Sequence, residues 1–240
     1  MDHDMTSHFK PGKRRVTTWD DVGRDTFVPD HYAMPEGSDL SAHIAAHPVA
    51  QMFTAHEGRL QVTAVPFVRA TGSKDQPLLL DGHMAARNPQ CAAIRDGAPV
   101  LLQFCAPGAY ISPRWFRERM TAPTWSYVTV QVRGRLRPIA TAADTLDIID
   151  RTVAHMEAQT LRAGETAWTC APLTDEQMDR YLGMILAFQV EVSAAEGICR
   201  LNQEKTDTDR QSIIEGLQLQ TDAGSRHIAA LMQAGMEASA

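Results

Sequence analysis

Alternation of hydrophobic and polar positions predicts β-strands along much of the chain. The clearest case is residues 125–138, where hydrophobic side chains fall at every second position until Gly134 interrupts the pattern. Such a period of two is typical of a strand with one apolar face. The dipeptide Glu57-Gly58 is expected to form a tight turn between two further strands. Strand-like patterns also occur at residues 50–54, 59–70 and 185–192, and two short apolar runs predict strands at residues 77–81 and 99–104, the latter apolar except for Gln103.

Hydrophobic residues at helical spacing predict several helices, most of them late in the chain. A short helix is expected at residues 38–47, and residues 84–94 have the pattern of a helix or of a turn and a helix. A long helix is expected at residues 141–161, with an apolar side formed by Leu146, Ile149, Val153 and Met156. Further helices are expected from Thr174 onwards and at residues 209–216 and 225–236. Five to seven strands with late helices predict an α+β fold built on a β-barrel.

The composition predicts a soluble cytoplasmic protein. The chain has 240 residues, of which 44% are hydrophobic and 22% charged, so it can form a sizeable core. Residues 1–26 are polar, and we interpret them as an N-terminal extension outside a single domain that spans residues 27–240. The sequence has neither a signal-peptide pattern nor an apolar stretch of membrane-spanning length. Four widely spaced cysteines fit no common zinc motif, and we expect them to be reduced and mostly buried.

Aromatic and arginine side chains cluster in the middle third of the chain. Tyrosines and tryptophans occupy positions 110, 115, 125 and 127, and nearby arginines are Arg87, Arg114, Arg117 and Arg119. Flat aromatic rings stack on planar ligands, and guanidinium groups bind phosphate or carboxylate. This combination favours a planar, anionic cofactor.

Several short motifs lie in and around this cluster. They read GHMAARNPQ at residues 82–90, AYISPRW at residues 109–115 and PTWSY at residues 123–127, with FVP at residues 27–29 and RLNQ at residues 200–203. In their order and spacing they resemble the PaiB family, the FMN-binding negative transcriptional regulators. The resemblance implies an FMN-binding split β-barrel, related to pyridoxamine-phosphate oxidases, with peripheral and C-terminal helices. It also implies a homodimer that holds the flavin where the two subunits meet.

The sequence departs from the family pattern at several positions. Family members commonly carry THLP where this chain has Thr63-Ala64-Val65-Pro66, and FQGPHAY where residues 104–110 read FCAPGAY. Two histidines of the pattern are therefore absent, and Cys105 is new. The asparagine of a PTWNY motif is Ser126 here, and a KLSQN segment is replaced by RLNQE at residues 200–204. These departures indicate a retained scaffold with altered pocket chemistry.

The resemblance implies a set of site residues. Those expected to contact the cofactor are His83, Arg87, Asn88, Tyr110, Ser112, Trp115, Trp125, Tyr127 and Gln203. Among them His83, Tyr110 and Ser112 are the candidates for proton transfer. Plainer roles stay open: Asn88 precedes a proline and is typical of a turn, and His83 could satisfy backbone groups. We expect one of Trp115 and Trp125 to shape the ligand pocket and the other to pack.

Three functions are compatible with these features. The first is an FMN-binding transcriptional regulator, although the net charge of −6 and the lack of a helix–turn–helix pattern do not favour direct nucleic-acid binding. The second is a flavin-dependent oxidoreductase that acts on a small molecule. The third is a haem b enzyme similar to piperazate synthase, which closes a nitrogen–nitrogen bond in N5-hydroxyornithine. Its axial ligand would come from His56, His83 or Cys105, although the more ordinary expectation for Cys105 is a small buried residue.

Overall fold

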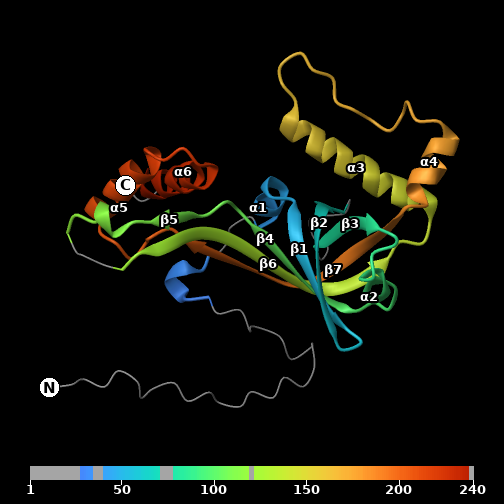
Figure 1. Cartoon of the computed structure of the whole chain (residues 1–240), viewed down its shortest axis with the longest axis horizontal. Coiled ribbons are helices and arrows are strands. Elements are labelled where there is room, and N and C mark those ends of the chain that lie inside the picture. Colours follow the sequence, from blue (N-terminus) through green and yellow to red (C-terminus); the bar gives the residue numbers. More distant parts are fainter. Residues whose placement is uncertain (1–27, 35–39, 71–77, 119–121, 238–240) are drawn as a thin grey trace.

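Most of the strands form a closed barrel (Figure 1). The structure is a computed structural model that describes residues 28–34, 40–70, 78–118 and 122–237. Within these ranges the strand order is β4-β1-β2-β3-β7-β6-β5, and all neighbours are antiparallel. A further antiparallel pairing of β4 with β6 closes the sheet and leaves β5 outside the ring. The predicted α+β fold with a split β-barrel is confirmed.

The barrel strands lie where the hydrophobic pattern predicts them. The first two form the expected hairpin, in which Glu57 and Gly58 have φ values of 49° and 73°. Positive φ at both central positions is characteristic of the type I′ turn that suits a tight hairpin. The barrel strands are β1 (Val49–His56), β2 (Arg59–Arg69), β3 (Leu79–Ala85), β4 (Pro99–Cys105), β6 (Thr124–Pro138) and β7 (Ile185–Arg200).

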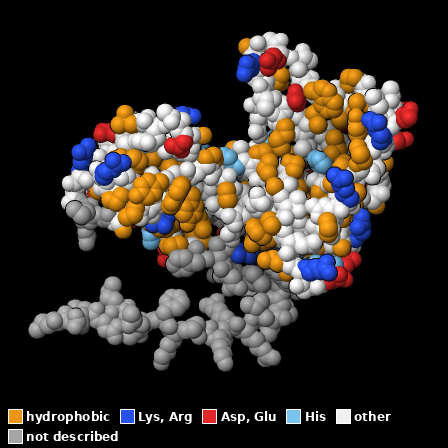
Figure 2. Space-filling view, viewed as in Figure 1, with side chains coloured by type: hydrophobic (Ala, Val, Ile, Leu, Met, Phe, Trp, Pro, Cys, Tyr) orange, Lys and Arg blue, Asp and Glu red, His pale blue; other side chains and the backbone are white. Residues whose placement is uncertain are grey.

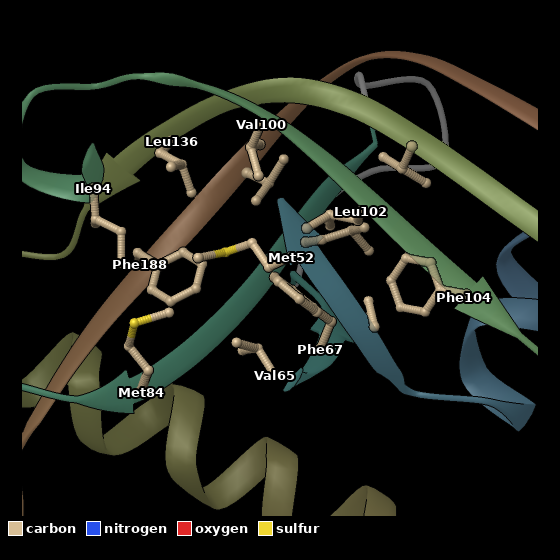
Figure 3. Close-up of a cluster of buried hydrophobic side chains, with 14 of the residues drawn as sticks. Met52, Val65, Phe67, Met84, Ile94, Val100, Leu102, Phe104, Leu136 and Phe188 are labelled. Atoms are coloured by element: carbon tan, nitrogen blue, oxygen red, sulfur yellow. The ribbon is translucent and has the colours of Figure 1, made fainter. Parts of the chain in front are cut away.

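Three phenylalanines lie at the centre of the barrel core (Figure 3). Phe67 on β2 meets Phe104 on β4 and Phe188 on β7 edge-on, and both pairs have ring centroids 5.9 Å apart. All three rings are buried, and such edge-to-face pairs add about 0.5–1.5 kcal/mol each beyond the burial of apolar area. The helices α1 (Leu40–Ala46) and α2 (Cys91–Arg95) contribute Ile44 and Ile94 to the same core.

A β-bulge lies where Gly134 interrupts the alternation. The pairing of β6 with β7 shifts register between Arg133 and Gly134, and Ser193 is left without a partner strand residue. A Cβ atom at Gly134 would lie 2.2 Å from the carbonyl oxygen of Glu191, so only glycine fits at this position. Bulges increase the twist of a strand pair. The two long strands therefore continue beyond the barrel and form the base of a second lobe.

The second lobe has a hydrophobic core of its own. The short strand β5 (Ala109–Ile111) adds to the far end of β6 and continues into the 3-10 helix η3 (Pro113–Trp115). The helices α5 (Asp207–Gln218) and α6 (Ala223–Glu237) cover one face of this extension. Ile111, Ile213, Leu217 and Ile228 are fully buried between the helices and the strand.

The helix α3 (Ala142–Thr160) lies along β2 and β3, and α4 (Asp175–Leu182) follows it after a loop. Thr141 and Thr174 cap the two helices with their side chains. The residues that α3 buries are Ile148 and Thr152, and neither belongs to the apolar side predicted at positions 146, 149, 153 and 156. No helix in the described ranges is both long enough and apolar enough to span a bilayer.

Tertiary pairing moves several predicted boundaries. Residues 84–85 belong to β3 because they pair with β7, and turn residues then precede the helix α2 at Cys91, so the segment predicted at residues 84–94 follows the turn-and-helix alternative. The strand predicted at residues 185–192 continues to Arg200 because β6 provides a partner beyond the bulge. The strand β5 was not predicted. Residues 1–26, together with Ser38 and residue 77, lie outside the described residues.

Three histidines connect the C-terminal lobe to the barrel. The ring of His43 on α1 is tilted against that of His47 with centroids 4.8 Å apart, and His47 meets His227 on α6 edge-on at 5.5 Å. Burial lowers the pKa of each of the three, and the neighbouring imidazoles lower the pKa of His43 and His47 further. The Nε2 atoms of His43 and His227 are buried and have no hydrogen-bond partner among the described residues. Protonation of these rings is therefore disfavoured in the folded chain.

We expect acid to destabilise the protein through this cluster. A histidine whose pKa is lower in the folded chain binds fewer protons there than in the unfolded chain, so the free energy of unfolding falls as pH drops below about 6.5. Chemical unfolding at several pH values between about 5 and 8 measures the slope. His227→Gln should flatten that slope, whereas His56→Gln, which removes a histidine outside the cluster, serves as the control. An unchanged slope in His227→Gln would contradict the assignment.

Candidate functional site

An exposed aromatic pair lies on the uncovered face of the second lobe. Along β6, Ser126 points toward the C-terminal helices and is buried, whereas Trp125 on the opposite face is 58% exposed. Tyr110 on β5 pairs with Trp125, is 46% exposed, and meets it edge-on with ring centroids 6.2 Å apart. Figure 2 shows hydrophobic side chains gathered over this lobe. Adjacent exposed aromatic rings form a candidate binding surface.

Basic and polar side chains border the Trp125–Tyr110 pair. Tyr127 is the next outward residue of β6, and its register partner on β7 is Arg200. The guanidinium of Arg200 lies 5.1 Å from the ring centroid of Tyr32 in η2 (Asp30–Tyr32). Burial raises the pKa of Tyr32, and the Glu204 carboxylate beside it raises it further, so this phenol stays protonated. We call Tyr110, Trp125, Tyr127 and Arg200 the aromatic face.

Three other predicted residues of this lobe serve its internal structure. The ring of Trp115 lies against Gly216 of α5, where a Cβ atom would approach it to 2.5 Å. Ser112 is buried, and its hydroxyl accepts hydrogen bonds from the backbone N and the Nε of Arg114. The side chain of Gln203 folds back and bonds the backbone at Leu201 and Cys199. Of the two tryptophans considered, Trp115 thus packs inside the lobe and Trp125 is exposed.

Two departures from the family pattern are in contact with each other. The amide of Asn202 donates a 2.8 Å hydrogen bond to the Ser126 hydroxyl, and both side chains are almost fully buried. Asn202 has a φ of 59°, a conformation that asparagine tolerates better than most residues. The pattern has asparagine and serine at these two positions, and here the two residue types are exchanged. The exchange keeps a hydrogen bond between the strand β6 and the turn after β7.

A second group of predicted residues lies after β3. Asn88 donates to the Thr63 hydroxyl at 3.0 Å and accepts from the backbone N of Gln90 at 2.9 Å. The Gln90 side chain in turn donates to the Met52 carbonyl and the Thr54 hydroxyl, both at 3.0 Å. This network ties the turn to the barrel. Arg87 beside it is exposed and has no hydrogen bond or ion pair within the ranges that the structure describes, so its guanidinium is free to bind a ligand.

His83 lies on the outer side of β3 that α3 covers. Its neighbours Gly82 and Met84 face the core, and Asp81, on the same side as His83, is bound by Arg151 of α3. Burial lowers the pKa of His83, and its Nδ1 atom is buried with no hydrogen-bond partner among the described residues. This histidine is therefore neutral and is separated from the aromatic face.

Strand register shows how far the predicted residues on and after β3 lie from the aromatic face. His83 pairs with Ala187, and the neighbouring Phe188 pairs with Pro138 at the last position of β6. Trp125 stands at the other end of this 15-residue strand. At about 3.3 Å per residue the two ends are separated by up to roughly 40 Å along the strand. One chain therefore does not bring the predicted site residues together.

An uncovered surface of the barrel lies between the aromatic face and the end of β3. In register, Val62, Phe53 and Leu101 follow one another across β2, β1 and β4. Val62 is 54% exposed, and Leu60 at the hairpin end is 77% exposed. Ala64, which replaces the histidine of the pattern, is exposed on the same surface. We call this outer surface of β1, β2 and β4 the open barrel face.

The three candidate haem ligands lie in three different places. His56 at the end of β1 pairs with Asp96 at 2.8 Å, and His83 lies beneath α3. Cys105 is exposed on the outer side of β4, so the expectation that it is buried was wrong. Its sulfur accepts from the Gln103 amide at 3.2 Å. No group of three or more metal-binding side chains occurs among the residues that the structure describes.

Comparison with known families identifies the scaffold. A family model described as "Putative FMN-binding domain" matches residues 26–194. The chain is also similar to the protease synthase and sporulation protein PAI 2 of Bacillus subtilis. The two sequences are 24% identical over 210 residues, which covers 86% of this chain and 96% of the relative.

Two solved structures share the fold at low sequence identity. An FAD- and haem-binding protein from Mycobacterium smegmatis superposes with a TM-score of 0.53 at 15% identity, over 75% of this chain and 80% of the other. The flavocytochrome Anf3 from Azotobacter vinelandii superposes with a TM-score of 0.50 at 15% identity, over 75% of each chain. At this identity the likeness concerns the fold alone.

Proposed function

The chain belongs to this FMN-binding domain family, and we propose that it binds FMN between two copies of itself and catalyses redox chemistry on a small molecule in the cytoplasm. Each site would combine the aromatic face of one copy with Arg87 of the other. The observation that carries the proposal is the exposed Trp125–Tyr110 pair at one end of an uncovered surface, with the free Arg87 guanidinium near the other end.

A two-fold arrangement explains why these residues are separated within one chain. An isologous dimer places the same surface patch of both subunits against each other. If the open barrel face is that patch and the two-fold axis passes through it, the aromatic end of one copy lies opposite the β3 end of its partner. Exposed apolar residues such as Leu60 and Val62 would then be covered. Two equivalent sites result.

The residues of the two ends fit the parts of FMN. Trp125 and Tyr110 offer flat apolar surface to the isoalloxazine ring and exclude water from one side of it. The Arg87 guanidinium suits the phosphate because it is exposed and has no partner within the described ranges. Bound flavin supplies electron and hydride transfer. Tyr110, which is 46% exposed, would offer its hydroxyl to hold or move a proton beside the ring, whereas Ser112 is already engaged by Arg114 and the Nδ1 atom of His83 is buried.

A haem-binding function is the second candidate, and one observation favours it. Cys105 is exposed at the end of β4, on the surface proposed for dimerisation, and a thiolate is an established axial ligand of haem iron. The structural relatives that carry both flavin and haem make this alternative worth testing in the same preparation. A Soret band in the purified or haem-reconstituted protein that disappears in Cys105→Ser would support it over the flavin assignment.

Flavin binding and subunit exchange test the main proposal. We expect the purified chain to be a dimer that binds one FMN per chain, measured by flavin absorbance and by mass in solution. Trp125→Ala and Arg87→Gln should each weaken FMN binding by about tenfold, because stacking on an aromatic ring adds about 0.5–1.5 kcal/mol beyond the buried area and a charge-assisted hydrogen bond adds about 1.5–3 kcal/mol. Arg59→Gln, which removes an exposed arginine at the β1–β2 turn, is the matched control and should bind FMN normally.

Mixing the two defective variants tests whether the site is shared. In a dimer of one Trp125→Ala chain and one Arg87→Gln chain, one site carries both defects and the other carries none. An equal mixture should therefore recover FMN binding in about one quarter of all sites. A monomer that binds FMN, or a mixture that recovers nothing, would contradict the proposed arrangement. A protein that ignores FMN altogether would contradict the function.

A further inference from the structure

A cavity of about 580 Å³ lies between α3, the loop 161–174 and α4. Its volume falls within the range of small-molecule sites, which is about 300–1,000 Å³. Figure 1 shows these elements on the side of the molecule away from β5 and the C-terminal helices. The cavity is therefore separate from the aromatic face.

The cavity exists because α3 has apolar residues on two sides. Ile148 and Thr152 face the barrel, whereas Leu146 and Val153 face the returning loop and line the cavity. The loop is fixed over them, since the Glu157 carboxylate accepts a 2.8 Å hydrogen bond from the backbone N of Trp168. Leu146 and Val153, two of the four residues on the apolar side predicted for α3, thus belong to the wall of the cavity.

The lining combines apolar surface with negative charge. Leu146, Val153 and Met178 provide the apolar part, and the half-exposed Trp168 indole lies on the lining. Asp150 and Asp175 add two carboxylates. Among the described lining residues there is no lysine, arginine or histidine to balance them. Asp150 also lies beside the buried Cys170 thiol, whose pKa is raised by burial and by this carboxylate.

We propose that this cavity binds a small hydrophobic cation, an amine or quaternary ammonium with an apolar body. The apolar wall would take the body, and the carboxylates would attract the charged group. The Trp168 indole would add a cation–π contact with the charged group. Such contacts contribute about 0.5–2 kcal/mol. An anionic ligand is disfavoured because two unbalanced carboxylates repel it. A neutral ligand would use the wall but gain nothing from Asp150 and Asp175.

A pair of probes that differ only in charge tests the proposal on the full-length protein. We expect 4-phenylbutylamine to bind saturably by titration calorimetry and to change tryptophan fluorescence in a way that Trp168→Phe abolishes. The alcohol 4-phenylbutanol should bind at least about tenfold more weakly, which corresponds to about 1.4 kcal/mol. Asp150→Asn combined with Asp175→Asn should weaken the amine by a similar factor and leave the alcohol unchanged.

Asp179→Asn is the matched control, because Asp179 lies on α4 and is not among the cavity-lining residues. It should bind the amine like the parent protein. The proposal is overturned if the amine does not bind, if the alcohol binds equally well, or if Asp179→Asn matches the effect of the double variant. Amine binding should persist in Trp125→Ala, so the outcome does not depend on flavin.

Discussion

Replacing Arg151 by alanine is expected to lower the free energy of unfolding by about 3–5 kcal/mol, because it leaves a buried carboxylate without its charge partner. Asp81 on β3 is 2% exposed, and its carboxylate accepts from Arg151 Nη2 at 2.8 Å and from the Gln189 amide at 2.9 Å. Arg151 also holds Asp147 on its own helix and the carbonyl of Arg69. It therefore fixes α3 to both β2 and β3. For a chain of this size the loss corresponds to a fall in Tm of roughly 10 °C.

Arg137→Ala is the matched control for this prediction. Arg137 pairs with Glu191 at 2.7 Å, but its side chain is 63% exposed. Exposed ion pairs contribute about 0–1 kcal/mol, so this variant should unfold almost like the parent. Adding Asp81→Asn to Arg151→Ala should restore at least about 1 kcal/mol, since no uncompensated charge then remains. Equal losses in Arg151→Ala and Arg137→Ala, measured by urea unfolding, would refute this role of Asp81.

The second large effect is expected at the buried pair of Ser126 and Asn202. Ser126→Ala should cost about 1–3 kcal/mol, because the Asn202 amide then has no acceptor in a buried position. Asn202→Gly should cost a similar amount through loss of the same hydrogen bond, and glycine accepts the φ of 59° without strain. The double variant should be destabilised by much less than the sum, with a coupling energy of at least about 1 kcal/mol.

A double-mutant cycle by chemical unfolding measures this coupling. Asn202→Ala is the informative comparison, since it loses the hydrogen bond and also places a Cβ residue at positive φ, and should be less stable than Asn202→Gly by about 1 kcal/mol. Strict additivity of Ser126→Ala and Asn202→Gly would show that the two side chains do not depend on each other. The exchanged residue types would then be unrelated changes.

Local patterns predicted the elements well because the physical causes are local. The alternation after Trp125 requires a strand with one apolar face, and Glu57-Gly58 supplies the positive φ values that a tight hairpin needs. Thr174 begins a helix because its hydroxyl and the Gln177 side chain satisfy each other's backbone groups in a capping box. Predictions failed where a strand is defined by its partner. Residues 193–200 lack regular alternation and are extended only because β6 lies beside them.

The residue types of the candidate site could be predicted from the sequence, but their arrangement in space could not. The sequence shows the aromatic rings and arginines, and the prediction that one tryptophan would pack is met by Trp115 on Gly216. Asn88, in contrast, is engaged with Thr63 and Gln90, a contact between segments 25 residues apart that no local pattern indicates. The roles of the remaining residues toward FMN stay predictions that the variants above test.

The sequence by itself determined the strands and helices, the hairpin turn, the interruption of the strand pattern at Gly134 and the residue types suited to a planar anion. These follow from side-chain periodicity and from backbone preferences of a few residues, which act over short distances along the chain. Only the tertiary structure decided that Trp125 and Arg87 lie at opposite ends of the molecule, and which side of α3 faces the barrel and which faces a cavity. These outcomes depend on strand register and on which of the two apolar sides of α3 packs against the barrel. Contacts between distant segments decide both, and the pattern within any one segment is compatible with either result.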